Sequence, residues 1–372
     1  MTADQPPALA GYTVAVTAAR RRDELGALLE RRGARVVYAP AIRLVPLDDD
    51  TELQLATTVC LERSPDLTIA TTGIGFRGWL EAADGWGLGD DLRKRLGDSR
   101  LLARGPKARG AIRAAGLTEE WSPASESMSE VLDHLLVQDL EGLRIVVQLH
   151  GEPLPDFIEA LEAAGAEVVG VPVYRWERPD DTTPLDRLLD QVTAGGVDAV
   201  TFTSAPAVAS MLAQAQDRGA EQQLLEAFCR DVVPVCVGPV TAAVLERRGV
   251  PTVQPDRPRL GNLVRAVVEH VPRRCGKRLQ VRGHRLDVRR HAVVVDGEVV
   301  ALASGPMAVL SSLAAQPGRV VSRRELLSSL PGAGSDEHAV EMAVTRLRAA
   351  LGDPSIIQTI VKRGYRLAFD PI

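Results

Sequence analysis

The stretch LLERRGARVVYAPAIR, residues 28–43, occurs a second time in this chain as ALEAAGAEVVGVPVYR, residues 160–175. The two copies align Gly33 with Gly165 and Pro40 with Pro172, 132 residues apart (160 − 28). Two further pairs follow in the same order: PDLTIATTGIGFRGWL (65–80) with VDAVTFTSAPAVASML (197–212), and ARGPKARGAIRAAGL (103–117) with CVGPVTAAVLERRGV (236–250). Matches in one order at nearly one spacing indicate a duplicated unit rather than a short-period solenoid.

Each copy alternates short apolar runs with segments of helical periodicity. TVAVTA, RVVYAP and LTIATT have the length and composition of buried strands, and DELGALLERRG and FRGWLEAA have helical spacing. An order of strand, loop, helix and strand is typical of parallel α/β layers. We therefore predict an α/β fold with two duplicated parallel-sheet units within residues 10–272.

Small and hydroxyl-bearing residues follow several of these strands. In open α/β sheets, ligands bind at the carboxyl ends of the strands, where helix N-termini attract anions. Basic residues in the 104–109 loop would meet carboxylates there. We predict a site for a small acidic ligand, such as a tetrapyrrole, another polycarboxylate or an oxyanion, at Thr71, Thr72, Arg104, Lys107, Arg109, Thr203, Ser204, Gly238 and Thr241.

The segment Gly73-Ile74-Gly75-Phe76-Arg77-Gly78 has the G-x-G-x-x-G spacing of a dinucleotide-binding turn. Such a site needs a carboxylate at the end of the next strand, where this chain has Arg104, and the repeat copy lacks the glycines. A tight turn that glycine makes possible is therefore favoured over a nicotinamide or flavin site. The four cysteines show no C-x-x-C spacing, which argues against a zinc ribbon and a disulfide framework.

The first ten residues lack the basic segment of a signal peptide, and no later run is apolar over the roughly 18 residues of a membrane span. We expect a cytoplasmic, reduced protein without a membrane segment.

Residues 10–270 resemble uroporphyrinogen-III synthase, the enzyme that closes and inverts a linear tetrapyrrole, through TFTSAPAV, VGPVTAAVLERRGV and VPVYRW. The resemblance implies two α/β domains joined by a two-stranded connection, with no metal and no organic cofactor. It places unit one at 10–44 and 177–272, and unit two at 45–176. Tyr174 matches the family's cleft tyrosine and is the catalytic candidate if the body is an enzyme. A half-buried tyrosine that packs the connecting strand is the alternative.

The first half departs from the synthase pattern. It reads GPKAR, with Ala108 where a threonine is common, and TTGIGF replaces TSxxAV. The predicted cleft does not depend on these side chains, because the resemblance implies binding through backbone amides and hydroxyls, and whether synthase activity is retained stays open.

Positive charge is concentrated at the end of an acidic chain. From Arg273 onward there are 16 Lys+Arg and 9 Asp+Glu, which leaves 28 and 40 of the chain's 44 and 49 for residues 1–272. A basic module on an acidic body is a common arrangement for nucleic-acid binding, because neutralising phosphates requires a local positive field.

The basic end contains several local structure signals. Asp296-Gly297 lies in an alternating run and predicts a hairpin, and Ser322 with Glu325 predicts a helix with a capping box. In the helix predicted over 336–351, Val340, Val344, Leu347 and Leu351 share one face. The opposite face carries His338, Thr345, Arg346 and Arg348.

Residues 277–372 resemble the winged-helix domain of OmpR/PhoB-type response regulators, through DGEVVALASGPMAVLSSLAAQPGRVVSRRELL, AVEMAVTRLRAALGD and IQTIVKRGYRL. The resemblance implies double-stranded DNA as partner, a recognition helix at 336–351, a wing at 357–367 and paired copies on DNA. Ala343 replaces a frequent histidine, and VKRGY shifts the wing's basic residues by one. The predicted DNA-binding residues are His338, Thr345, Arg346, Arg348, Lys362, Arg363 and Tyr365.

No phosphorylatable receiver pattern precedes this domain. The sequence therefore favours a transcription regulator whose body senses a ligand, and the architecture resembles actinobacterial regulators of nitrate and nitrite assimilation. Two alternatives stay open: an active uroporphyrinogen-III synthase with a regulatory tail, and a body that docks a partner transcription factor without any ligand.

Overall fold

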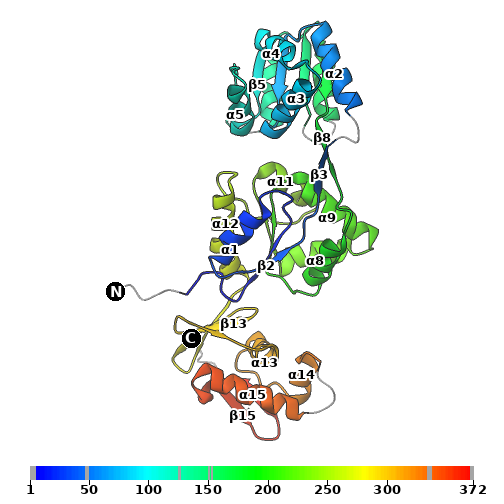
Figure 1. The fold of residues 1–372 in the computed structure, drawn as a ribbon. Coiled ribbons are helices and arrows are strands. Elements are labelled where there is room, and N and C mark those ends of the chain that lie inside the picture. The colour runs from blue at the N-terminus through cyan, green and yellow to red at the C-terminus, as the bar shows by residue number, and fades with distance from the viewer. Residues whose placement is uncertain are drawn as a thin grey trace, which may run out of the picture. The chain divides into compact units, whose positions relative to one another are not determined.

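The computed structural model describes residues 6–46, 50–124, 127–149, 151, 154–332 and 337–368 (Figure 1). Its contacts divide the chain into a larger unit, Met1–Ile42 with Pro179–Ile372, and a smaller unit, Arg43–Arg178. The larger unit contains one α/β sheet and a C-terminal domain that begins at Lys277, and the smaller unit contains the second α/β sheet. The predicted fold class, a duplicated α/β body followed by a winged helix, is confirmed.

The α/β sheet of the larger unit is parallel throughout, in the order β10-β9-β1-β2. Its strands are β1 (Thr13–Val16), β2 (Arg35–Tyr38), β9 (Ala199–Phe202) and β10 (Val233–Cys236). Its helices are α1 (Arg22–Glu30), α8 (Thr183–Thr193), α9 (Ala205–Asp217), α10 (Glu221–Arg230), α11 (Pro239–Glu246) and α12 (Leu260–Arg274). Every residue of β1, β9 and β10 is buried. Helices cover both faces of such a sheet, which explains why these strands are continuous apolar runs instead of alternating ones.

The smaller unit repeats this sheet in space. Its strands are β4 (Leu67–Ala70), β5 (Arg100–Ala103), β6 (Arg144–Gln148) and β7 (Glu167–Val171), parallel in the order β5-β4-β6-β7. Its helices are α2 (Thr51–Glu62), α3 (Gly73–Gly85), α4 (Gly89–Asp98), α5 (Pro106–Ala114), α6 (Met128–Leu136) and α7 (Pro155–Ala163). The sequence repeat pairs β9 with β4, β10 with β5 and β2 with β7, so equivalent strands hold equivalent places in the two sheets. The smaller unit is inserted in the chain between β2 and β9.

Two antiparallel strands of the smaller unit carry the chain into and out of it. They are β3 (Arg43–Pro46) and β8 (Tyr174–Glu177), and Arg43 pairs with Glu177 in register. The Arg43 guanidinium also lies 2.8 Å from the Glu177 carboxylate. The predicted two-stranded connection is therefore present.

The C-terminal domain begins with an antiparallel sheet in the order β11-β12-β13-β14. Its elements are β11 (Lys277–Val281), β12 (His284–Val288), β13 (Ala292–Val295), β14 (Glu298–Ala301), α13 (Ser304–Ala315), α14 (Arg323–Ser329), α15 (His338–Leu351), the 3-10 turn η1 (Pro354–Ile356), β15 (Ile357–Ile360) and β16 (Gly364–Leu367). Positive φ angles at Asp296 (51°) and Gly297 (99°) make the predicted hairpin turn between β13 and β14. The capping box of Ser322 and Glu325 is formed at the start of α14.

Little chain separates the body from this domain. Helix α12 continues to Arg274, and β11 begins at Lys277. Only Cys275 and Gly276 separate them, because Val267 and Val271 hold α12 in the core of the α/β sheet up to this junction. All four cysteines are free. Within the described part of the chain, no helix combines the length and apolar character needed to cross a membrane.

Candidate functional site

The predicted recognition helix α15 has one buried and one exposed face. Its buried residues, which join the core of the C-terminal domain, are Val340, Ala343, Val344, Leu347 and Leu351. His338, Thr345 and Arg346 are exposed, and the Thr345 hydroxyl donates to the Glu341 carbonyl at 2.8 Å. The Arg346 side chain makes no ion pair with another described residue. Arg346 is thus available to a groove of DNA. Residue 336, the first of the predicted helix, lies outside the described residues.

Arg348 lies at the side of this face and contacts the wing. Its Nε and Nη2 donate to the Ile357 carbonyl at 3.0 and 2.6 Å, and Nη2 also donates to the Thr359 hydroxyl at 2.9 Å. These bonds join α15 to the first wing strand, β15. The structure gives Arg348 a positioning role, and its contact with DNA stays a prediction.

The wing turn between β15 and β16 exposes its basic residues. Lys362 and Arg363 are exposed beside Val361, whose side chain is 79% exposed. Gly364 has φ of 131°, and a Cβ there would overlap the Val321 carbonyl, so only glycine fits. The wing therefore presents two cations on a turn held by close packing.

Tyr365 is 5% exposed, unlike the other predicted DNA-binding residues. Its ring lies 5.5 Å from the Arg323 guanidinium and 5.9 Å from that of Arg348. Arg323 also lies 3.5 Å from Glu341 of α15. Tyr365 thus packs against the arginines of α14 and α15 beside the wing. Its contact with DNA stays a prediction. Sequence reasoning missed Arg323, because only its tertiary contacts distinguish it from Arg324.

An ion cluster connects the hairpin of the C-terminal domain to the end of α15. His284 Nδ1 lies 2.6 Å from Asp296 Oδ2, and its Nε2 lies 3.5 Å from Asp353 Oδ2, just after α15. The hydrogen bond with Asp296 is the main cause that raises the pKa of His284. The pKa values of Asp296 and Asp353 are lowered, mainly by backbone hydrogen bonds from Arg285 and Ser355.

We expect this cluster to make stability depend on pH. The folded-state pKa of His284 is raised above its unfolded value of about 6.5. The contribution of the cluster is therefore complete below that value and is lost as pH rises through the folded-state pKa. Between about pH 6 and about pH 8, the Tm of the wild type should fall relative to that of His284→Gln, measured by thermal unfolding. His270→Gln, at an exposed histidine of α12, is the control and should follow the wild type. Parallel curves for wild type and His284→Gln would contradict the assignment.

In the smaller unit, one buried glutamine organises the predicted ligand loop. The Thr71 hydroxyl donates to the Gln148 carbonyl at 2.6 Å, and the Thr72 N–H donates to Gln148 Oε1 at 3.1 Å. Thr72 Oγ1 caps α3 by accepting from the Gly75 N–H, and lies 3.0 Å from the Tyr174 hydroxyl. Tyr174 is 7% exposed and Gln148 is completely buried. The structure thus brings Thr71, Thr72 and Tyr174 together around Gln148, which sequence reasoning missed.

Packing explains two glycines of the G-x-G-x-x-G segment. A Cβ at Gly75 would overlap the Gln148 amide, and one at Gly73 would overlap the Lys107 carbonyl. These close approaches bring the N-termini of α3 and α5 side by side. Packing therefore accounts for these two glycines.

The basic residues near these helix ends differ in their partners. Lys107 is exposed in the first turn of α5 and forms no ion pair with another described residue. Arg109 lies 4.0 Å from Glu119, which pairs more closely with Arg113 at 2.6 Å. Arg104 follows β5 directly. The loop edge of the smaller unit thus combines two helix N-termini with cationic side chains, which suits an anion.

The larger unit has an equivalent loop edge, described here by itself. Thr203 and Ser204 precede α9, Gly238 precedes α11, and Thr241 lies in the first turn of α11 with 4% exposure. Sequence reasoning missed Arg20. It is exposed on the loop after β1, next to β9 in the sheet, and its position after an apolar strand was the available signal.

Comparison with protein families gives two matches. Residues 23–265 match the family described as uroporphyrinogen-III synthase HemD. Residues 297–367 match the family described as transcriptional regulatory protein, C terminal.

Two of the relatives below match the α/β body, and the third matches the C-terminal domain. The uncharacterized protein YjjA of Bacillus subtilis is 30% identical over 258 residues, 69% of this chain and 94% of the relative. A solved mutant uroporphyrinogen III synthase from Thermus thermophilus is 31% identical with a TM-score of 0.60, covering 70% of this chain and 100% of its own. The transcriptional regulatory protein CutR of Streptomyces coelicolor is 37% identical over 91 residues, 24% of this chain and 42% of its own.

Proposed function

From the premise that the chain belongs to the uroporphyrinogen-III synthase HemD family and carries a C-terminal domain of transcriptional regulators, we propose that it is a DNA-binding transcription regulator whose body binds a small acidic ligand. The observation that carries this proposal is that one predicted ligand edge and the DNA-binding domain belong to the same compact unit. The α/β sheet with the Ser204 and Gly238 loops and the domain with the exposed Arg346 belong to one compact unit. Ligand binding can change DNA affinity only if the ligand binds the DNA-competent and DNA-incompetent states unequally.

The ligand part of the proposal is supported by charge at the loop edges. Lys107, near the N-termini of α3 and α5, and Arg20, after β1, offer cations to carboxylates. We expect uroporphyrin I, a tetrapyrrole polycarboxylate, to raise the Tm of the chain in thermal-shift titrations. Lys107→Ala should weaken uroporphyrin binding roughly tenfold or more, because a hydrogen bond to a charged group contributes roughly 1.5–3 kcal/mol.

Lys94→Ala provides the matched control, since Lys94 is an exposed lysine of α4 outside the loops. It should respond as the wild type does. Citrate, nitrate and nitrite extend the ligand panel to smaller anions. If no anion raises the Tm, or if both lysine variants respond alike, the sensing loops are wrong and a body that docks a partner transcription factor is favoured.

Synthase activity is the second candidate, and the 3.0 Å contact between Thr72 Oγ1 and the Tyr174 hydroxyl favours it. This contact holds the candidate catalytic hydroxyl at the ligand edge. The altered loops GPKAR and TTGIGF argue against rapid turnover. Incubation with hydroxymethylbilane distinguishes the two, and rapid formation of the type III isomer would establish the enzyme. Nitrate and nitrite assimilation stays a prediction from resemblance, tested by transcript levels in a deletion strain grown on nitrate.

A further inference from the structure

One turn of the C-terminal domain fastens it to the α/β sheet of the larger unit. This turn, residues 289–291 between β12 and β13, lies at the amino ends of β1 and β9, opposite the Ser204 and Gly238 loops of the same sheet. Arg289 Nη1 donates to the Ala10 carbonyl at 2.8 Å, and the His291 N–H donates to the Gly11 carbonyl at 3.0 Å. We call the junction of this turn with residues 10–13 and 195–198 the seam.

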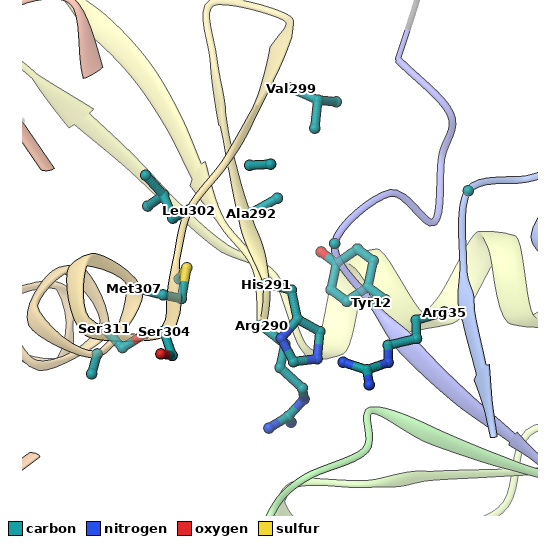
Figure 2. A pocket seen from close by; sticks show the side chains of 14 residues that line it. Tyr12, Arg35, Arg290, His291, Ala292, Val299, Leu302, Ser304, Met307 and Ser311 are labelled. Carbon is teal, nitrogen blue, oxygen red and sulfur yellow. The ribbon is translucent and has the colours of Figure 1, made fainter. Parts of the chain in front are cut away.

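A cavity of about 660 Å³ lies beside the seam (Figure 2). Arg35, Arg290 and His291 line one end, and their nitrogen atoms lie near one another in the view. Leu302 and Met307, at the start of the helical part of the C-terminal domain, line the other end. The cavity thus has a cationic end and an apolar end, with walls from both parts of the larger unit.

The charges at the cationic end are only partly neutralised. Arg290 Nη2 lies 3.0 Å from Asp198 Oδ1, and His291 Nε2 lies 2.9 Å from the Thr13 hydroxyl. The Arg35 guanidinium, which is exposed at the start of β2, pairs with no carboxylate among the described residues. Burial, and then the charges of Arg35 and Arg290, lower the pKa of His291. An anion placed there would meet an uncompensated positive potential.

We propose that this cavity, the seam pocket, binds a small organic carboxylate whose carboxylate lies at Arg35 and His291 and whose apolar body lies against Leu302 and Met307. The volume is within the range of roughly 300–1,000 Å³ that is usual for small-molecule sites. Ser304 and Ser311 add hydroxyls to the wall from α13. Nothing in this proposal depends on the predicted ligand loops. Those of the larger unit lie at the other end of its sheet, and those around Lys107 belong to the smaller unit.

Such a ligand would contact both walls, so it would also stabilise the docked C-terminal domain. A ligand that binds only the docked arrangement favours that arrangement by mass action. The seam pocket would therefore be a second ligand site, in addition to the loops, that acts on the C-terminal domain. Unlike the loops, it requires a ligand with an apolar body.

Isothermal titration of the full chain tests the ligand chemistry directly. The probes are octanoate and benzoate, which combine a carboxylate with an apolar body, and acetate, inorganic phosphate and octan-1-ol, which supply only one of the two features. We expect octanoate or benzoate to bind at least roughly tenfold more tightly than all three single-feature probes, since a charge-assisted hydrogen bond and buried apolar area both contribute.

Two variants locate the site. Arg35→Gln should weaken binding of the preferred probe roughly tenfold or more, and Ala308→Phe, which fills the cavity from α13, should abolish it. The matched control is Arg31→Gln, an exposed arginine at the end of α1 outside the cavity, which should bind normally. Because Lys107 and Arg35 lie at different sites, the Lys107→Ala response to uroporphyrin tests the loops separately.

Three results would overturn the seam pocket. The first is that neither octanoate nor benzoate binds the wild type, and the second is that a single-feature probe binds as tightly as they do. The third is that Arg35→Gln and Arg31→Gln bind the preferred probe with equal affinity. A failure of the uroporphyrin titration alone affects only the proposed sensing loops.

Discussion

Replacing Asp198 by alanine is expected to lower the free energy of unfolding by roughly 3–5 kcal/mol, because it removes the buried carboxylate of an ion pair whose other member, Arg290, is only 24% exposed. The Asp198 side chain is 3% exposed; its Oδ1 pairs with Arg290 at 3.0 Å and its Oδ2 accepts from the Thr13 N–H at 2.7 Å. Arg290 also donates to the carbonyls of Gly195 and Val197. The variant would leave the Arg290 guanidinium without its carboxylate and the Thr13 N–H without an acceptor at the seam. Urea unfolding of the full chain measures the loss.

The control is Asp190→Ala, in the same unit. Asp190 pairs with Arg218 at 2.6 Å, but its side chain is 66% exposed, so the loss should be no more than about 1 kcal/mol. Asp198→Asn keeps an acceptor for the Thr13 N–H and should be intermediate. The two alanine variants would lose equal stability if the seam pair were as weak as a surface pair, and that result would contradict its role as the fastening of the C-terminal domain.

Arg346→Ala is expected to weaken binding to a preferred DNA site by roughly 1–3 kcal/mol, the cost of a lost base contact, without changing the Tm. Arg346 is exposed on α15, so its removal disturbs no packing. Arg348→Ala should instead lower both affinity and Tm, since it removes the bonds that join α15 to Ile357 and Thr359. Gel-shift titrations on a duplex enriched from a random pool, with thermal unfolding in parallel, separate these effects.

Lys362→Ala is the comparison for the wing. It should weaken binding to all sequences and reduce the slope of affinity against salt by about 1, as expected for one lost phosphate contact. Unchanged affinity in Arg346→Ala would contradict the recognition-helix assignment. A change confined to salt dependence would reassign Arg346 to the phosphate backbone.

Local and periodic patterns in the sequence were sufficient to predict the architecture. The repeat at 28–43 and 160–175 indicated two equivalent sheets, and the structure has the same strand order in both. Asp296-Gly297 predicted its hairpin, and Ser322 with Glu325 predicted its cap, because each of these motifs is formed by residues close in the chain. The amphipathic pattern of the helix predicted over 336–351 is local in the same way, and the excess of positive charge from Arg273 onward indicated nucleic acid as its partner.

The tertiary structure alone decided which side chains are available for function. Gln148 became the centre of the Thr71 and Thr72 loop because β6 lies beside β4 in the sheet, a pairing of residues 77 positions apart. Arg346 and Arg348 look alike in sequence, yet a neighbouring wing strand draws one of them away from the exposed face.

The seam joins Thr13 with Asp198 and His291, which are 185 and 278 residues away in the chain. Helical and strand periods indicate which face of an element is buried, whereas a side chain's partners depend on the elements that fold against it from distant parts of the sequence. For this reason the sequence determined the sheets, the cap and the helix α15, and only the tertiary structure decided how the C-terminal domain is fastened to the body.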